Sequence, residues 1–225
     1  SSEAQKAFGS SDLYFEEYLK NCRHIEIQII GDGTGSVSHL WDRECSLQRR
    51  FQKILEIAPS PGLRTKFREE LIKAALGITS RVNYKGLGTV EFLVDLEGKT
   101  FRFIEANARL QVEHTVTEEI LGLDLVKAQI QIALGKSLKQ INLDQANIPK
   151  PKGFAIQARV NMEVIDSEGN TKPSGGTFTH FDLPSGPGVR TDTYGYTGYE
   201  SNPAFDSLIA KVITHSPEGN FKDAV

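Results

Sequence analysis

The sequence of 225 residues carries 26 Lys and Arg against 29 Asp and Glu, a formal net charge of −3. This length allows one large domain or two modest ones, and 39% hydrophobic residues are enough for a buried core. The slightly acidic balance excludes a general binder of nucleic acid or membrane surfaces. Any anion site must therefore come from cations gathered locally.

Cys22 and Cys45 are too few for a disulfide framework and do not form a CxxC pair. They favour a reducing compartment, which predicts the cytoplasm, or the mitochondrion in a eukaryote. The first twenty residues hold no apolar signal-peptide core, and no apolar run reaches the roughly 18 residues of a membrane span. Because the chain begins without Met and ends at Phe221–Val225 in what reads as a starting helix, we expect a fragment of a longer protein.

The first half of the chain reads as strands around one long helix. Residues 24–30 alternate polar and apolar, which predicts a half-buried strand, and residues 37–41 predict its hairpin partner. The glycines of Gly31–Ser36 resemble a phosphate loop, but a strand follows where such a loop needs a helix, so we expect a plain turn. Residues 48–56 are expected to be extended. Residues 65–81 predict a helix whose apolar face is Phe67, Leu71, Ala74, Ala75 and Ile78.

The second half begins with an expected β-hairpin over residues 88–105. A helix capped by Asp124 and ended near Gly135 precedes a polar connector over residues 136–152, where we place a domain boundary. From Gly153 onward short alternating strands are broken by Gly and Pro. The pattern predicts an α+β (α/β) fold with an antiparallel sheet.

Glu91 and Glu105 lie on the two strands of the predicted 88–105 hairpin. A three-residue loop at 97–99 places the two carboxylates opposite each other, and a two-residue turn at 97–98 places them on opposite faces. We favour the first register. Paired carboxylates repel unless a hard cation such as Mg²⁺ binds between them, so the alternatives are a metal site or exposed surface glutamates.

Five polar residues recur at every second position after this strand, namely Glu105, Asn107, Arg109, Gln111 and Glu113. In an extended segment they share one face, with apolar residues on the other. This mixture of acid, amide and guanidinium indicates a site rather than a solvated edge strand. Upstream, Arg43, Arg49, Arg50 and Lys53 form a basic cluster that suits either an oxyanion or a solvated face.

The segment Phe103–His114 resembles the signature of the biotin carboxylase family, with the skeleton Glu-x-Asn-x-Arg-x-Gln-Val-Glu-His. Residues 23–28, 42–53 and 88–93 resemble the same family in the same order, so the likeness covers essentially the whole chain. The resemblance implies the C-terminal lobe of an ATP-grasp fold, followed by part of the β-rich C-terminal domain of biotin carboxylase. It divides the chain into the end of the lid subdomain and hinge (1–20), the ATP-grasp core (21–150) and the partial C-terminal domain (151–225).

The resemblance also implies how a nucleotide is bound. The ligands of Mg²⁺ (or Mn²⁺) bridging the ATP phosphates would be Glu91, Glu105 and Asn107. The adenine contacts would be Glu16, the backbone of Glu17, Leu19 and, beneath the ring, Leu93. The ribose and phosphate contacts would be His24 and Gln48.

The remaining implied roles belong to bicarbonate and biotin. Bicarbonate would be held by Lys53, Arg109 and the backbone at Gln111 and Val112. Glu113 would act as general base, and Arg159 would stabilise the biotin enolate. Bicarbonate attack on ATP gives carboxyphosphate, whose CO₂ passes to N1 of biotin. Implied partners are a biotin carboxyl carrier domain and a carboxyltransferase, and a homo-oligomer is left open.

Two departures from the family pattern matter. Phe51 stands where His or Asn is expected, and the resemblance implies that the family's N-terminal domain and glycine-rich ATP lid would lie before residue 1. We therefore expect this chain alone to bind ATP weakly and turn over little. The alternative function is another ATP-grasp ligase or a carbamoyl-phosphate synthetase-like enzyme. The final acceptor is open, although Gly195–Tyr199 loosely resembles acyl-CoA carboxylases of fatty acid metabolism.

Overall fold

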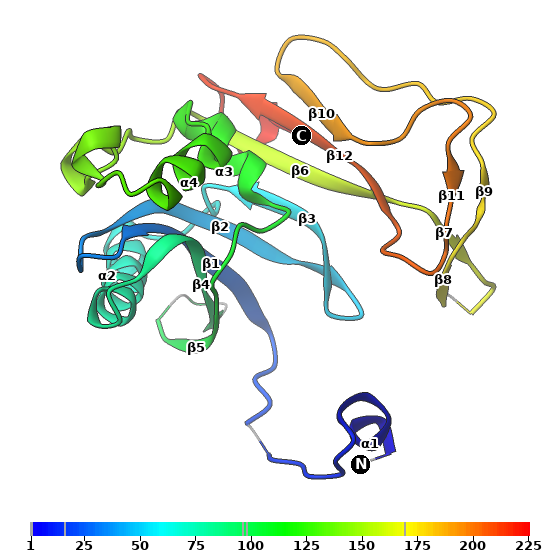
Figure 1. Cartoon of the computed structure of the whole chain (residues 1–225), viewed down its shortest axis with the longest axis horizontal. Helices are drawn as coiled ribbons and strands as arrows, with labels where there is room; N and C mark the ends of the chain where they lie inside the picture. The colour runs from blue at the N-terminus through cyan, green and yellow to red at the C-terminus, as the bar shows by residue number, and fades with distance from the viewer. Residues whose placement is uncertain (1, 16, 96, 98, 169) are drawn as a thin grey trace.

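The computed structural model describes residues 2–15, 17–95, 97, 99–168 and 170–225 (Figure 1). Its centre is an eight-stranded antiparallel sheet in the order β10-β12-β6-β3-β2-β1-β4-β5. The strands of this sheet are β1 (Cys22–Asp32), β2 (Val37–Arg49), β3 (Gln52–Ala58), β4 (Lys85–Asp95), β5 (Phe101–Asn107), β6 (Phe154–Asn161), β10 (Val189–Thr193) and β12 (Leu208–Ser216).

Two small ribbons and the helices complete the fold. The ribbons are β7 (Glu163–Ile165) with β8 (Thr171–Pro173), and β9 (Gly176–Thr177) with β11 (Glu200–Ser201). The α-helices are α1 (Ser2–Phe8), α2 (Thr65–Arg81), α3 (His114–Leu121) and α4 (Leu125–Ala133). Short 3₁₀ turns are η1 (Lys139–Ile141), η2 (Gln145–Asn147) and η3 (Phe221–Asp223). Within the described ranges, no helix is long and apolar enough to cross a membrane.

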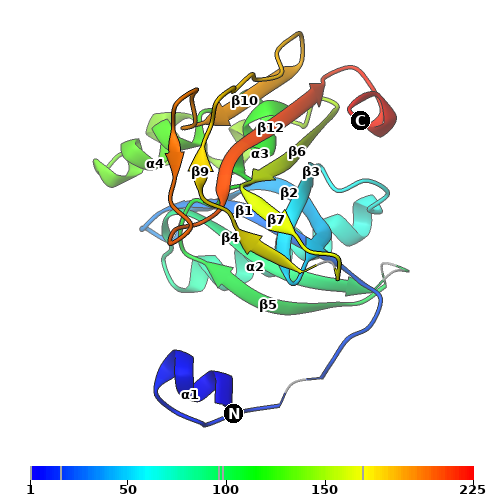
Figure 2. The ribbon, with the colours of Figure 1, turned by 90° about the vertical axis from the view of Figure 1, so that its right-hand side faces the viewer.

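Helices cover both faces of the sheet, α2 on one and α3 and α4 on the other (Figures 1 and 2), and an apolar core lies on each face. Helix α2 packs Phe67 and Leu71 against Ile25 and Ile27 of β1, and α3 and α4 pack on the other face around Leu40. The 65–81 helix and the 24–41 hairpin are thus confirmed. The expected helix face is wrong at Ile78, which is 38% exposed, while Ile72 is buried instead.

Strand β1 is buried on both faces, which corrects the half-buried prediction. Its polar residues Glu26 and Gln28 are fully buried, because the guanidinium of Arg43 on β2 lies over them and hydrogen bonds to both. An alternating pattern shows which residues share a face, but it does not show whether the polar face meets water or a buried partner.

Residues 48–56 are not one extended segment but the β2–β3 hairpin. Its tip is formed by Arg50 and Phe51, with φ of 51° and 65°. Hairpin tips with positive φ usually carry Asn and Gly, so Arg and Phe give no turn signal in the sequence.

Strand β6 pairs with β3, so the sheet continues across the predicted boundary near residue 150. The connector before it holds η1 and η2, and Trp41 Nε1 donates to the carbonyl of Pro149 at 2.9 Å. The three-part division of the chain at residues 20 and 150 stays a prediction.

Candidate active site

The β4–β5 hairpin brings Glu91 opposite Glu105, as favoured from the sequence, but by a different route. Near the loop Val94 faces Phe101, which is the register of a two-residue turn, so the expected three-residue loop register is wrong there. A bulge at Ile104 then shifts the pairing by one residue and restores Glu91 opposite Glu105. The loop positions 96 and 98 lie outside the described residues.

The two carboxylates point to the same side of the hairpin, as the amide group of Asn107 shows by contacting both. Asn107 Nδ2 lies 2.9 Å from Glu91 Oε1 and 2.9 Å from Glu105 Oε1. Glu91 is buried, whereas Glu105 is exposed. The two carboxylates are therefore close enough for one amide group to contact both.

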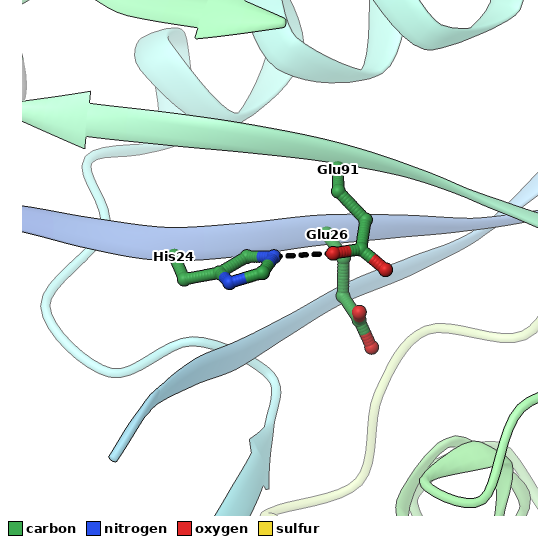
Figure 3. A group of neighbouring side chains, drawn as sticks. All are labelled: His24, Glu26 and Glu91. Carbon is green, nitrogen blue, oxygen red and sulfur yellow. Dashed lines mark hydrogen bonds and ion pairs between the residues drawn. The ribbon is translucent and has the colours of Figure 1, made fainter. Parts of the chain in front are cut away.

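Glu91 is surrounded by further donors. His24 Nε2 lies 2.5 Å from Glu91 Oε2, on the side of β1 shown in Figure 3, and Gln111 Nε2 lies 2.9 Å from Oε1. Gln48 Nε2 lies 2.8 Å from His24 Nδ1, which leaves Nε2 of that ring as the donor to Glu91. Burial raises the pKa of Glu91, but the hydrogen bond from His24 and the charge of Lys53 lower it to about 2.

Lys53 is the centre of the second cluster. Its Nζ lies 2.6 Å from Glu26, 2.7 Å from Glu113 and 3.1 Å from Glu91. Burial lowers the pKa of Lys53, but the carboxylates, Glu26 first, raise it overall. For Glu113, burial raises the pKa, but the charges of Lys53 and Arg43 outweigh this effect and lower the pKa overall. Lys53 and Glu113 are therefore a charged pair at neutral pH.

Arg159 on β6 completes the cluster. Its Nη2 lies 3.2 Å from Glu113 Oε2, and its Nε and Nη2 each lie 2.6 Å from Glu56 Oε1. The guanidinium thus lies between a buried carboxylate of β3 and the carboxylate that immediately precedes α3.

His24, Lys53, Glu91, Glu113 and Arg159 line one cleft of about 1160 Å³, whereas the fully buried Glu26 and Glu56 do not border it. Every predicted site residue that the structure describes borders it, namely Glu17, Leu19, His24, Gln48, Lys53, Glu91, Leu93, Glu105, Asn107, Arg109, Gln111, Val112, Glu113 and Arg159. The predicted residue Glu16 lies outside the described residues. The structure thus brings the set together, while the role of each residue stays a prediction.

Three residues have surroundings that the sequence did not indicate. His24, expected at the ribose and phosphates, is engaged by Glu91. Arg109 is exposed and its Nη1 donates to the carbonyl of Leu110 at 3.3 Å. Phe51 is 91% exposed on the cleft wall, so an apolar ring stands at the position where a polar side chain was expected.

Sequence reasoning did not predict that the charged side chains of Glu26, Arg43 and Glu56 are fully buried. Arg43 Nε donates to Glu26 and its Nη1 lies 3.0 Å from Thr117 Oγ1. Glu26 sits in an alternating polar and apolar strand, which was a signal that a polar face existed, whereas Arg43 lies between two acidic residues and Glu56 between two apolar ones. What the pattern lacked was the partner strand, which turns that face inward.

The donor set at the β5 edge fits a hard divalent cation. Glu91 and Glu105 offer carboxylate oxygens, and Asn107 offers an amide oxygen, the ligand types that Mg²⁺ takes. Gln111 Oε1 is buried beside them and meets no hydrogen-bond donor among the described residues. His24, Glu26 and Glu91 (Figure 3) also place possible ligand atoms within 4.8 Å of one another, but Lys53 forms ion pairs with both carboxylates.

The comparisons with known proteins agree with this site. Residues 1–141 match the family described as the carbamoyl-phosphate synthase L chain, ATP binding domain, and residues 157–225 match the biotin carboxylase C-terminal domain. The fold and the site therefore define an ATP-binding domain of the ATP-grasp class. The chain belongs to the biotin carboxylase family.

Individual relatives support the same assignment. The chain is 45% identical to the biotin carboxylase of Nostoc sp., covering 96% of this chain and 47% of that protein. It is 49% identical to pyruvate carboxylase 1 of Caenorhabditis elegans, covering 94% of this chain and 18% of that protein. The biotin carboxylase domain of Hydrogenobacter thermophilus 2-oxoglutarate carboxylase, solved with MgADP, ADP and bicarbonate, has a TM-score of 0.88 at 44% identity. That similarity covers 96% of this chain and 46% of the solved one. The chain thus spans about half the length of the biotin carboxylases it matches.

Proposed function

We propose that this chain forms the catalytic cleft of a biotin carboxylase, which uses MgATP and bicarbonate to carboxylate biotin. The observation that carries this is the layout of the cleft. The carboxylate oxygens of Glu91 and Glu105, which are ligands suited to Mg²⁺, line the β5 edge of the cleft. At the β3–β6 end, Lys53 and Arg159 contact Glu113. Family membership and a relative solved with MgADP and bicarbonate support the same pairing of ligands.

In the first step bicarbonate attacks the γ-phosphate of ATP, giving carboxyphosphate and ADP. Glu91, Glu105 and Asn107 would hold Mg²⁺ (or Mn²⁺), which supplies neutralisation of the phosphate charge. Lys53, Arg109 and the peptide groups of Gln111 and Val112 would hold bicarbonate. Glu113 would accept its proton. An ionised Glu113 suits a base, and Lys53 at 2.7 Å places a cation beside the oxyanion it produces.

In the second step carboxyphosphate breaks down to CO₂ and phosphate, and CO₂ joins N1 of biotin on a carrier domain while the N1 proton passes to the released phosphate. Arg159 would stabilise the enolate oxygen of the ureido ring, because a guanidinium at the cleft wall offers a fixed charge and several donors. Glu16, Glu17, Leu19 and Leu93 would contact the adenine of the nucleotide. A carboxyltransferase would then use carboxybiotin. Relatives include both pyruvate carboxylases and biotin carboxylases, so we assign no final acceptor.

The test is ATP hydrolysis by the full-length protein with Mg²⁺, with and without bicarbonate and free biotin. Bicarbonate should be required, biotin should stimulate turnover, and the exposed-loop variant Glu97→Gln should behave as wild type. ATP consumption that depends on ammonia or an amine instead would favour a carbamoyl-phosphate synthetase-like enzyme or another ligase. It would refute the biotin carboxylase assignment.

A further inference from the structure

Lys211 on β12 is a mostly buried cation to which none of the roles above is assigned. Its side chain is 12% exposed, and it does not line the cleft. Its Nζ donates to the carbonyl of Val112 at 3.1 Å and lies 3.3 Å from Asp192 Oδ2. Burying a lysine costs free energy unless its charge and its donors have partners, so these contacts are informative.

Strand pairing and a chain of ion pairs hold Lys211 in place. Asp192 of β10 lies directly opposite Lys211 in the sheet. Asp192 accepts from Arg190 Nε at 2.9 Å and Nη2 at 3.0 Å, and Arg190 Nη1 lies 2.9 Å from Glu118 Oε2 on α3. These ion pairs connect helix α3 to Lys211, and Lys211 connects back to Val112, which lies just before that helix.

The two peptide groups before Glu113 are therefore both held by their carbonyls. Gln111 O accepts from the Nδ1–H of His114 at 2.8 Å, and Val112 O accepts from Lys211. In a trans peptide the N–H points away from the C=O of the same plane, so fixing each carbonyl also fixes the N–H of the next residue. The N–H groups of Val112 and Glu113, two residues that line the cleft, have no acceptor among the described residues.

We propose that Lys211 is a positioning residue that fixes the Val112–Glu113 peptide group and thereby the anion-binding end of the cleft. Lys211 acts through the backbone and does not touch the substrate. The identity of the anion, bicarbonate, rests on the proposed function, whereas the fixing of the backbone does not. Without Lys211 this peptide group would be free to rotate, and the N–H donors and the carboxylate of Glu113 would lose their defined positions.

The first experiment is kinetic, in the full-length protein. Lys211→Met should raise the KM for bicarbonate in MgATP hydrolysis by about 10-fold, because one charge-assisted hydrogen bond that fixes the anion donors is lost. The KM for MgATP should change by less than about 2-fold, since Lys211 does not contact the carboxylates at the β5 edge. Lys211→Arg, which keeps the charge and the donors, should recover part of the loss. Asp192→Asn, which leaves the bond to Val112 in place, should have a smaller effect.

A matched control is Arg68→Met. Arg68 is also a mostly buried cation that contacts one carboxylate and one carbonyl, with Nε 2.7 Å from Asp42 Oδ1 and Nη2 3.1 Å from Ser60 O. None of these three residues lines the cleft. This variant should lose stability without separating the two KM values. An equal rise in both KM values, or an unchanged KM for bicarbonate, in Lys211→Met would overturn the proposal.

A second experiment does not depend on activity. The backbone N–H of His114 bonds to Gln111 O at 3.3 Å, so amide hydrogen exchange over residues 109–116 reports on the same turn. Followed by mass spectrometry, exchange in this segment should be faster in Lys211→Met, and exchange over residues 65–81 of α2 should be unchanged. If Lys211→Met fails to fold, Lys211→Gln is measured in its place with the same expectation. Absence of bicarbonate dependence in the wild type would refute the proposed function alone, whereas unchanged exchange over residues 109–116 would refute the role of Lys211.

Discussion

At the β3–β6 end of the cleft, Glu26, Glu56 and Glu113 each contact a lysine or arginine of the chain. At the β5 edge, Glu105 accepts from the amide of Asn107, and no Lys or Arg among the described residues forms an ion pair with it. Glu91 lies between the two ends and has both kinds of partner. At the β5 edge, therefore, a cation that pairs with Glu105 would have to be a bound ion and not a side chain of the described residues.

The two ends of the cleft use glutamate in two different ways. Carboxylates paired with internal cations fix the positions of Lys53 and Arg159, and they contribute to stability as well as to the site. The unpaired carboxylate leaves negative charge facing the cleft, where a divalent ion with a nucleotide would neutralise it. Substitutions at the two ends should therefore have different consequences.

The largest effect is expected for Glu91→Gln, because Glu91 belongs to both ends. Turnover of MgATP by the full-length protein should fall by about 10²–10⁴-fold, since the charge that holds the metal and orients Lys53 is lost. Steady-state ATP hydrolysis measures this. Mn²⁺ binding followed by electron paramagnetic resonance should weaken in parallel, and a variant with wild-type Mn²⁺ affinity would contradict the metal assignment. Glu97→Gln, on the exposed loop, is the control.

The next effect is on stability, at the internally paired end. Arg43→Met leaves Glu26 buried without its fully buried arginine partner, and should lower the free energy of unfolding by about 3–5 kcal/mol. Urea unfolding measures this value. The exposed Arg102→Met should change it by less than about 0.5 kcal/mol. Similar values for the two variants would show that the buried pair does not stabilise the fold.

The third prediction concerns pH. The pKa of Glu91 falls from 4.5 to about 2 on folding, so its contribution is present above the unfolded pKa and is lost as pH falls from about 5 to 2. The contribution is on the order of 3 kcal/mol. Unfolding curves of wild type and Glu91→Gln should therefore converge at low pH. Burial raises the pKa of Glu56, which also makes stability depend on pH. Because Glu56 is present in both proteins, its contribution cancels when the two unfolding free energies are subtracted. Parallel curves would contradict the lowered pKa.

The smallest effect is expected for Glu105→Gln at the open end. Its stability should stay within about 0.5 kcal/mol of wild type, because an exposed carboxylate without an internal cation contributes little to folding. Mn²⁺ affinity should still fall measurably. A clear loss of stability with unchanged metal affinity would reverse the distinction between the two ends.

Local signals in the sequence predicted the α2 helix, the β1–β2 hairpin and the Asp124 cap, whose carboxylate accepts from Lys127 N at 2.7 Å. These features depend on 3.6- or two-residue periods and on neighbours a few positions away. The residue list of the cleft was also predictable, because its motif is long and specific. The Arg50–Phe51 turn was missed, since neither residue type favours positive φ.

Register and burial were decided by the tertiary structure. The bulge at Ile104 sets which face Glu105 occupies, and no residue type at that position encodes a bulge. Glu56 became a buried partner of Arg159 because β3 and β6, which are distant in sequence, lie side by side, whereas Glu26 and Arg43 pair across the consecutive strands β1 and β2. The sequence by itself determined which groups carry charge and at what spacing. The three-dimensional packing determined which charges lose water, because desolvation depends on neighbours that the local sequence does not contain.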